Sequence, residues 1–319
     1  MSALRLLSLG VVLAAAGASA QSDGGVEARE RCARRIAGAL LGTGPDTTLL
    51  NAANPQSLVA SILAPAAVLA DGGVPTTPFQ EKFSRYINAT FNSVPGMVPA
   101  EDAPYALTKY VLQNGLPWKD LFVGPYKVNP GVDSTVPAVV VTDSTGLGYF
   151  RSRTWMVRYA GNETAGYRLV AAYRMVNNVL GVKLTAAQNT GGIDTATRAS
   201  NPACQGCHFD PVFGLDLVAK VLSKRVGTGS SMTFSAPTDG PQVLLGGQTI
   251  SNDAQLINAM VASTDFRFRA CRLAAGFLYG RPEYQCEGAI FDRCMTSFAA
   301  TGKITDAIAA IAQDPSFCQ

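Results

Sequence analysis

Histidine is almost absent from this chain: His208 is the only one in 319 residues. A single imidazole excludes every metal site that needs two histidines from one chain. Charged residues are also scarce, at 15% of the sequence against 47% apolar residues, and the formal net charge is only +3. A balance so close to neutral argues against a role in binding nucleic acids or anionic membrane surfaces, which attract strongly basic chains.

Long apolar runs are missing as well. A membrane-spanning helix needs about 20 apolar residues, and the apolar stretch at residues 6–16 is too short. It follows Arg5 and precedes Ala-Ser-Ala at residues 18–20, so residues 1–20 have the layout of a secretory signal peptide. Gln21, rather than a cysteine, follows the cleavage site and does not indicate a lipoprotein anchor. We therefore expect an exported protein, periplasmic or secreted, whose mature chain has no transmembrane anchor and a net charge of about +2.

One short motif carries recognisable chemistry. Residues 204–208 read Cys-Gln-Gly-Cys-His, which is a C-x-x-C-H sequence. This is the attachment signature of c-type haem, in which two thiols add across the porphyrin vinyl groups and the imidazole ligates the iron. On a helix, positions i, i+3 and i+4 share one face, so Cys204, Cys207 and His208 can point at one flat ligand. The sequence predicts one covalent haem c, held by Cys204 and Cys207, with His208 as the proximal iron ligand.

Other sites that use this motif fit less well. A structural zinc site needs four ligands, and the chain offers neither a second C-x-x-C pair nor a second histidine. A thioredoxin-like redox pair requires a βαβ context, whereas the flanking sequence has helical patterning. An export signal upstream favours haem, because c-type haem is attached after export.

The sixth iron ligand has to come from elsewhere in the chain. Methionine is the usual partner in electron-transfer haems of this type and raises the reduction potential. Met232 lies in a Gly- and Ser-rich loop, 24 residues after His208, and is the first candidate. Met260 is the second, although a methionine on a helical stripe is more often a core residue. An empty sixth site is the alternative.

Three functions are compatible with these features. The first is an electron-transfer cytochrome that serves an unknown redox partner protein. The second is a haem enzyme or gas-binding protein with an open distal site, and the third is a haem-carrying subunit of a larger redox complex. The chain has no distal histidine and no paired carboxylates near the motif, since Asp210 is expected to cap a helix. These absences favour electron transfer, with no catalytic residue assigned.

Apolar residues recur at spacings of three and four, which predicts a mainly α fold with a small β element. We expect an N-terminal helical region at residues 21–130, a connector at residues 131–195, and a multi-helical haem domain at residues 196–319. Expected helices include residues 27–41, 55–69, 78–91, 103–113, 167–180, 211–225, 253–263, 265–279 and 287–300. Residues 136–142 and 149–159 are expected to be extended, and residues 227–247 to form a loop.

The motif and its surroundings resemble the planctomycete-type cytochrome c proteins. The resemblance rests on residues 201–208, on Asp210 and Pro211, and on Phe213-Gly214-Leu215. The C-terminal part is also similar, with Phe268 to Cys271, Leu278 to Arg281, Cys286, Phe298, Gly302 and residues 314–317. The likeness covers about residues 165–319 and implies the haem, the helical fold and a closing domain. Only Phe209 separates His208 from Asp210, which is fewer residues than that family usually has.

Five cysteines remain beyond the motif, four of them after residue 270. A chain with this many cysteines suits an oxidising compartment. Because the number of cysteines beyond the motif is odd, one of them is left without a partner in the chain. The resemblance implies a bond between Cys271 and Cys286 and a second between Cys294 and Cys318, which would leave Cys32 over.

Overall fold

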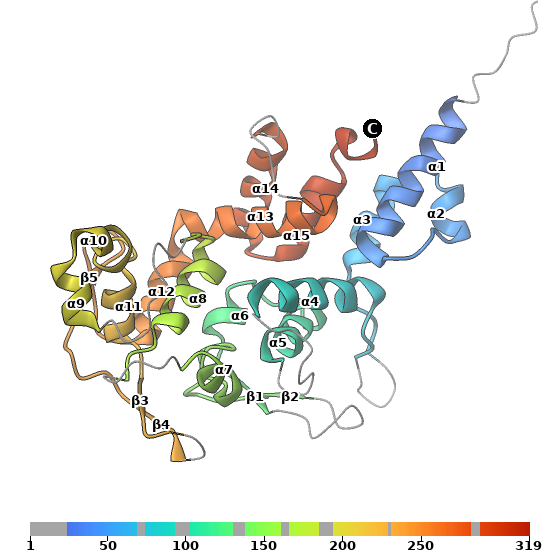
Figure 1. The fold of residues 1–319 in the computed structure, drawn as a ribbon. Coiled ribbons are helices and arrows are strands. Elements are labelled where there is room, and N and C mark those ends of the chain that lie inside the picture. The colour runs from blue at the N-terminus through green and yellow to red at the C-terminus, as the bar shows by residue number, and fades with distance from the viewer. Residues whose placement is uncertain are drawn as a thin grey trace, which may run out of the picture.

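The computed structural model describes residues 24–68, 74–92, 102–129, 138–160, 166–184, 194–228, 231–281 and 288–319. The predicted signal peptide lies outside these residues. The described part contains 15 α-helices and three small antiparallel strand pairs (Figure 1), which confirms the predicted mainly α fold. None of its helices combines the length and the apolar character that crossing a membrane requires.

The described chain begins with a group of short helices. They are α1 (Gly24–Ile36), the π-helical turn η1 (Ala37–Leu41), α2 (Thr47–Asn51), the 3-10 turn η2 (Pro55–Leu58) and α3 (Val59–Leu63). Apolar residues on one side of α1 and η1 are buried, with Cys32, Ile36 and Leu40 at most 6% exposed. Gly42 ends η1 in the left-handed conformation that helix C-termini favour, with a φ of 73°.

Two helices with the predicted boundaries, α4 (Pro78–Phe91) and α5 (Ala103–Gln113), pack against each other. Thr77 begins α4 with a capping box. Its hydroxyl accepts a hydrogen bond from the backbone N–H of Gln80 (3.2 Å), and the Gln80 side chain accepts one from the N–H of Thr77 (2.9 Å). The buried apolar face of α4 consists of Phe79, Phe83, Ile87 and Phe91.

The connector contains the predicted strand and one helix that the sequence does not predict. β2 (Val139–Thr142) pairs antiparallel with β1 (Tyr126–Asn129). Residues 149–159 are not extended, because α7 (Arg153–Arg158) lies within them. The Ser152 hydroxyl caps α7 by accepting the N–H of Trp155 (3.3 Å), whose ring packs edge-on against neighbouring aromatic rings. The flanking helices are α6 (Asp120–Val123) and α8 (Leu169–Leu180).

The predicted motif lies in a region of short elements at one end of the molecule (Figure 1). These are α9 (Thr195–Ser200), α10 (Pro202–His208), α11 (Leu215–Val221), β3 (Lys224–Val226), β4 (Thr233–Ser235), β5 (Gln242–Leu244) and β6 (Gln248–Ile250). The helix expected at residues 211–225 is therefore shorter. The expected loop at residues 227–247 instead contributes to two hairpins, β3–β4 and β5–β6. Three-residue strands are too short for a visible alternation of apolar and polar residues.

Four helices and a final turn complete the chain. They are α12 (Asp253–Ala262), α13 (Thr264–Tyr279), α14 (Gly288–Thr301), α15 (Ile304–Ala312) and the 3-10 turn η6 (Pro315–Cys318). α12, α13 and α14 lie close to their predicted positions. α13 packs against α14, α15 and α8, and η6 packs against α1.

The disulfide pairing implied by the family resemblance is wrong. The structure joins Cys32 to Cys318 and Cys271 to Cys294, while Cys286 lies outside the described residues. The prediction failed because α14 packs along α13 and brings Cys294 to Cys271. The contact of η6 with α1 likewise brings Cys318 to Cys32. Disulfides persist in oxidising compartments, so both bonds are compatible with an exported protein.

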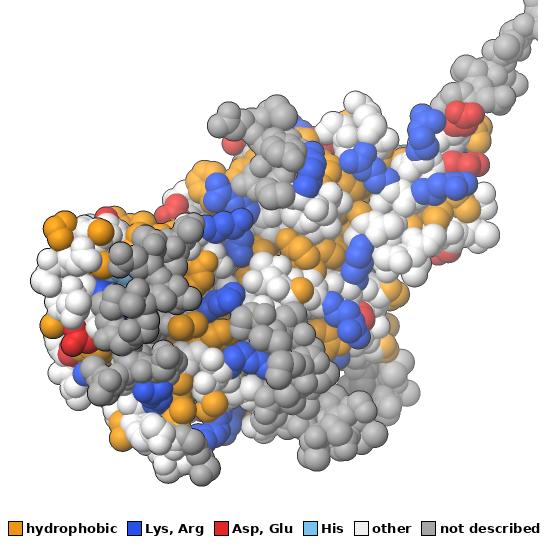
Figure 2. All heavy atoms as spheres, in the orientation of Figure 1, with side chains coloured by type: hydrophobic (Ala, Val, Ile, Leu, Met, Phe, Trp, Pro, Cys, Tyr) orange, Lys and Arg blue, Asp and Glu red, His pale blue; other side chains and the backbone are white. Residues whose placement is uncertain are grey.

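α10 and α11 differ in how deeply their side chains are buried. α11 buries Leu215, Val218 and Val221 in the main hydrophobic core and packs against α8. α10 has no buried residue. Lys and Arg side chains are spread among apolar and uncharged groups over the face seen in Figure 2. The motif helix is therefore a surface element supported by a well-anchored neighbour.

Candidate haem-attachment site

The C-x-x-C-H motif forms the helix that the haem hypothesis requires. Asn201 caps α10 by accepting the N–H of Ala203 with its side chain (3.0 Å), and Pro202 occupies the first turn. Cys204 and Cys207 are half-buried and are not joined in a disulfide. Because α10 is helical through His208, the two thiols and the imidazole share one face. The donor set for a c-type haem is thus assembled within two turns of one helix.

His208 is bonded to a carboxylate that the sequence analysis did not identify. Its Nδ1 lies 2.7 Å from Oδ2 of Asp216. The His208 side chain is 23% exposed, whereas that of Asp216 is 1% exposed. Asp216 belongs to the first turn of α11, so the bond links the surface helix α10 to the anchored helix α11.

Asp216 is the centre of a buried polar cluster. Its carboxylate accepts hydrogen bonds from Nε and Nη2 of Arg198 (2.8 and 2.7 Å) and from the hydroxyl of Thr195 (2.7 Å). Burial alone would raise the pKa of Asp216, but the hydrogen bonds from His208, Arg198 and Thr195, together with the Arg198 charge, lower that pKa to about 2. The carboxylate is consequently ionised at neutral pH.

The charge of Asp216 determines which nitrogen of His208 is available. An ionised carboxylate can only accept hydrogen bonds, so Nδ1 has to carry the proton. A neutral imidazole protonated at Nδ1 has its lone pair on Nε2. Metal-ligating histidines commonly have this arrangement, because the bond at the second nitrogen fixes the ring and increases its basicity. The residues of the site therefore fit a haem iron bound at Nε2.

A tight turn at Gly214 holds α10 and α11 together. Its N–H donates to the carbonyl oxygen of Asp210 (2.7 Å), and the Asp210 carboxylate accepts the N–H of Val212 (2.7 Å). Asp210 thus caps this turn, and α11 begins only after it. This corrects the expectation that the helix starts at Pro211.

We expect Gly214→Ala to destabilise this part of the protein. A Cβ on Gly214 would lie 2.6 Å from the carbonyl oxygen of Asp210 and 2.8 Å from that of His208, so the backbone has to move. The expected loss in free energy of unfolding is about 1–3 kcal/mol. Gly206→Ala is the matched control, since a Cβ there meets nothing within 4 Å. Urea denaturation of both variants measures the difference, and equal stabilities would contradict the prediction.

The two methionines predicted as sixth ligand occupy different environments. Met232 is half-buried and directly precedes β4, at the turn end of the β3–β4 hairpin. Figure 1 shows this hairpin extending away from α10. Met260 is fully buried in α12 and belongs to the hydrophobic core. Met232 thus belongs to a hairpin and Met260 to the core, and the assignment of Met232 as sixth ligand stays a prediction.

Sequence reasoning missed Asp216, Arg198 and Thr195, although one signal was available. Asp216 interrupts an otherwise apolar run from Phe213 to Ala219. An acidic residue on the apolar face of a helix has to find a partner when it is buried. Arg198 and Thr195 lie before the motif, and only the packing of α9 beside α10 brings them to Asp216.

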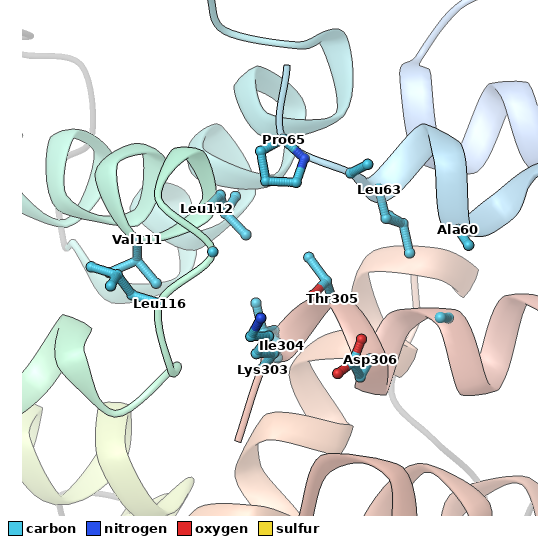
Figure 3. A pocket seen from close by; sticks show the side chains of 13 residues that line it. Ala60, Leu63, Pro65, Val111, Leu112, Leu116, Lys303, Ile304, Thr305 and Asp306 are labelled. Atoms are coloured by element: carbon cyan, nitrogen blue, oxygen red, sulfur yellow. The ribbon is translucent and has the colours of Figure 1, made fainter. Parts of the chain in front are cut away.

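One pocket in the described residues lies away from the motif. It has a volume of about 260 Å³ and lies among α3, α5 and α15 (Figure 3). Its lining is mainly apolar, with Leu63, Leu112 and Ile304 facing it beside Lys303 and Asp306. No group of three or more His, Cys, Asp or Glu side chains that could hold a bare metal ion occurs in the described part of the chain.

Functional information from other proteins does not add to this picture. Comparisons with protein-family models, curated proteins and solved structures found no match to this chain.

Proposed function

We propose that this protein is an exported monohaem c-type cytochrome that carries electrons to or from a partner protein. Cys204 and Cys207 would hold the haem through thioether bonds, each formed when a thiol S–H adds across a vinyl group. His208 would ligate the iron through Nε2. The haem supplies a one-electron couple, and the chain supplies its attachment, orientation and electrostatic environment.

The observation that carries the proposal is the hydrogen bond between His208 and Asp216. It lies within one helical turn of two cysteines that form no disulfide. A histidine that serves only as a surface residue has no need of a buried, ionised carboxylate on one nitrogen. The predicted signal peptide and the two disulfides support export to the periplasm or beyond the cell.

A haem-stained denaturing gel tests the proposal directly. The full chain would be produced in bacteria that export it and attach c-type haem. We expect a band at the mature mass that retains peroxidase-active haem after boiling, because thioether bonds survive denaturation. An exported, unstained band would overturn the proposal.

The second candidate function is a haem enzyme or gas-binding protein with an open distal site. The positions of Met232 and Met260 favour it, since one lies in a hairpin away from α10 and the other in the core. Distal ligands and distal polar groups decide between electron transfer and ligand binding. The state of the sixth site therefore separates the two candidates.

Met232→Ala tests the predicted sixth ligand. If the thioether of Met232 ligates the iron, its removal is expected to convert a low-spin spectrum to a high-spin one and to lower the reduction potential. Visible spectra of the oxidised and reduced protein record the change. Met295→Ala, a half-buried methionine in α14, is the control and should leave the spectrum unaltered. A wild-type protein that is already high-spin and binds carbon monoxide would support the second candidate instead.

A further inference from the structure

We propose that Asp216 is the positioning residue of the proximal ligand: it orients the His208 ring and lowers the reduction potential of the haem. This inference rests on the proposed haem attachment and goes beyond it, because it assigns a redox role to a residue outside the motif. The carboxylate reaches His208 from α11, eight residues further along the chain.

The geometry of Asp216 gives it one fixed orientation. Arg198 binds both carboxylate oxygens through Nε and Nη2, at 2.8 and 2.7 Å, and Thr195 donates to Oδ1 at 2.7 Å. A bidentate pair of this kind fixes the plane of the carboxylate as well as its position. Oδ2 is then held 2.7 Å from Nδ1 of His208, so the imidazole plane is fixed in turn. The cluster links α9, α10 and α11 around one acceptor.

The electrostatic effect follows from the sign of the charge. A carboxylate that accepts the Nδ1 proton gives the imidazole partial imidazolate character and makes Nε2 a stronger donor. A stronger donor, with a negative charge behind it, stabilises ferric iron relative to ferrous iron. The Asp216 side chain is 1% exposed, so water screens this interaction less than it would at the surface.

The positive charge of Arg198 reduces this effect without cancelling it. The carboxylate lies between the guanidinium and the imidazole, because Oδ2 accepts from Arg198 Nε and contacts His208 Nδ1. The negative charge is therefore closer to the ring than the positive one. A simple structural ion pair between α9 and α11 would hold the helices together equally well but would not require contact with His208.

The variant Asp216→Asn tests whether Asp216 has a redox role or only a structural one. The variant keeps the shape and one acceptor oxygen but removes the charge. We expect the reduction potential to rise, so that the ferric-to-ferrous ratio at a fixed ambient potential falls at least tenfold, which corresponds to about 59 mV for one electron. Spectroelectrochemical titration of the haem-loaded protein measures it, and Asp216→Glu should recover most of the shift.

Asp210→Asn is the matched control. It removes the same charge two residues from His208, but this carboxylate caps the Gly214 turn by accepting the N–H of Val212. We expect its ferric-to-ferrous ratio to change by less than about threefold, since a more exposed charge is screened by solvent and salt. Equal shifts in the two variants would overturn the inference, because they would reflect general charge rather than the bond to His208.

A measurement on the wild-type protein covers the case in which Asp216→Asn does not fold. Resonance Raman spectra of the ferrous haem, after photolysis of its carbon monoxide complex, report the iron–histidine stretch. We expect a higher frequency than in haem proteins whose proximal histidine donates to a backbone carbonyl. A frequency equal to theirs overturns it while the haem proposal stands, whereas a wild-type chain without covalent haem overturns both.

Discussion

Replacing Cys204 and Cys207 together with serine is expected to abolish covalent haem attachment completely. A serine hydroxyl does not add to a porphyrin vinyl group, so neither thioether bond can form. Both cysteines are half-buried and outside the disulfides, so their loss should leave the helices of the haem-free chain intact. Haem staining of a denaturing gel and the mass of the intact protein check the outcome. Circular dichroism of the same sample checks the fold.

Gly206→Ala is the control for this experiment because it changes the same turn of α10. A Cβ at this position meets no atom within 4 Å, so the motif helix should form and the haem should attach. Haem that remains covalently bound to the double serine variant would contradict the assignment of Cys204 and Cys207. Loss of haem from the Gly206→Ala variant would show that the assay reports disturbance of α10 rather than loss of thiols.

The sequence predicted those helices best whose signals are local. α4 and α5 have the predicted boundaries because each helix has a first-turn proline and regularly spaced apolar residues, and Thr77 caps α4 from the preceding position. Residues 149–159 were predicted wrongly because β-branched and aromatic residues suggest a strand, whereas the Ser152 cap and the packing of Trp155 produce a helix. In this segment the strand preference of the β-branched and aromatic residues was outweighed by the packing of the aromatic side chains.

The candidate site was only half visible in the sequence. Cys204, Cys207 and His208 are contiguous, so their spacing alone predicted a shared helical face. Asp216 and Arg198 belong to different helices, and their hydrogen bonds depend on how α9 and α11 pack around α10. The predicted disulfide pairing was wrong for the same reason. Which cysteines meet is decided by tertiary contacts, which a family resemblance over part of the chain did not reproduce.

Removing the Cys32–Cys318 disulfide is expected to destabilise the protein more than removing the Cys271–Cys294 disulfide. Cross-links stabilise mainly by limiting the unfolded chain, and the effect grows with the logarithm of the loop that they close. The sequence separations are 286 and 23 residues. This relation gives about 6 kcal/mol for the long loop and about 3 kcal/mol for the short one.

The double variants Cys32→Ala/Cys318→Ala and Cys271→Ala/Cys294→Ala are controls for each other, since both remove two buried or half-buried sulfur atoms. Urea denaturation of the oxidised proteins, followed by circular dichroism, gives the two free energies of unfolding. The long-range bond also secures contacts of the C-terminal turn: Phe317 is fully buried, and Arg35 donates to the backbone oxygen of Gln319 (2.8 Å). A larger loss on removing Cys271–Cys294 would mean that local packing of α13 and α14, rather than closure of the chain ends, dominates the stabilisation.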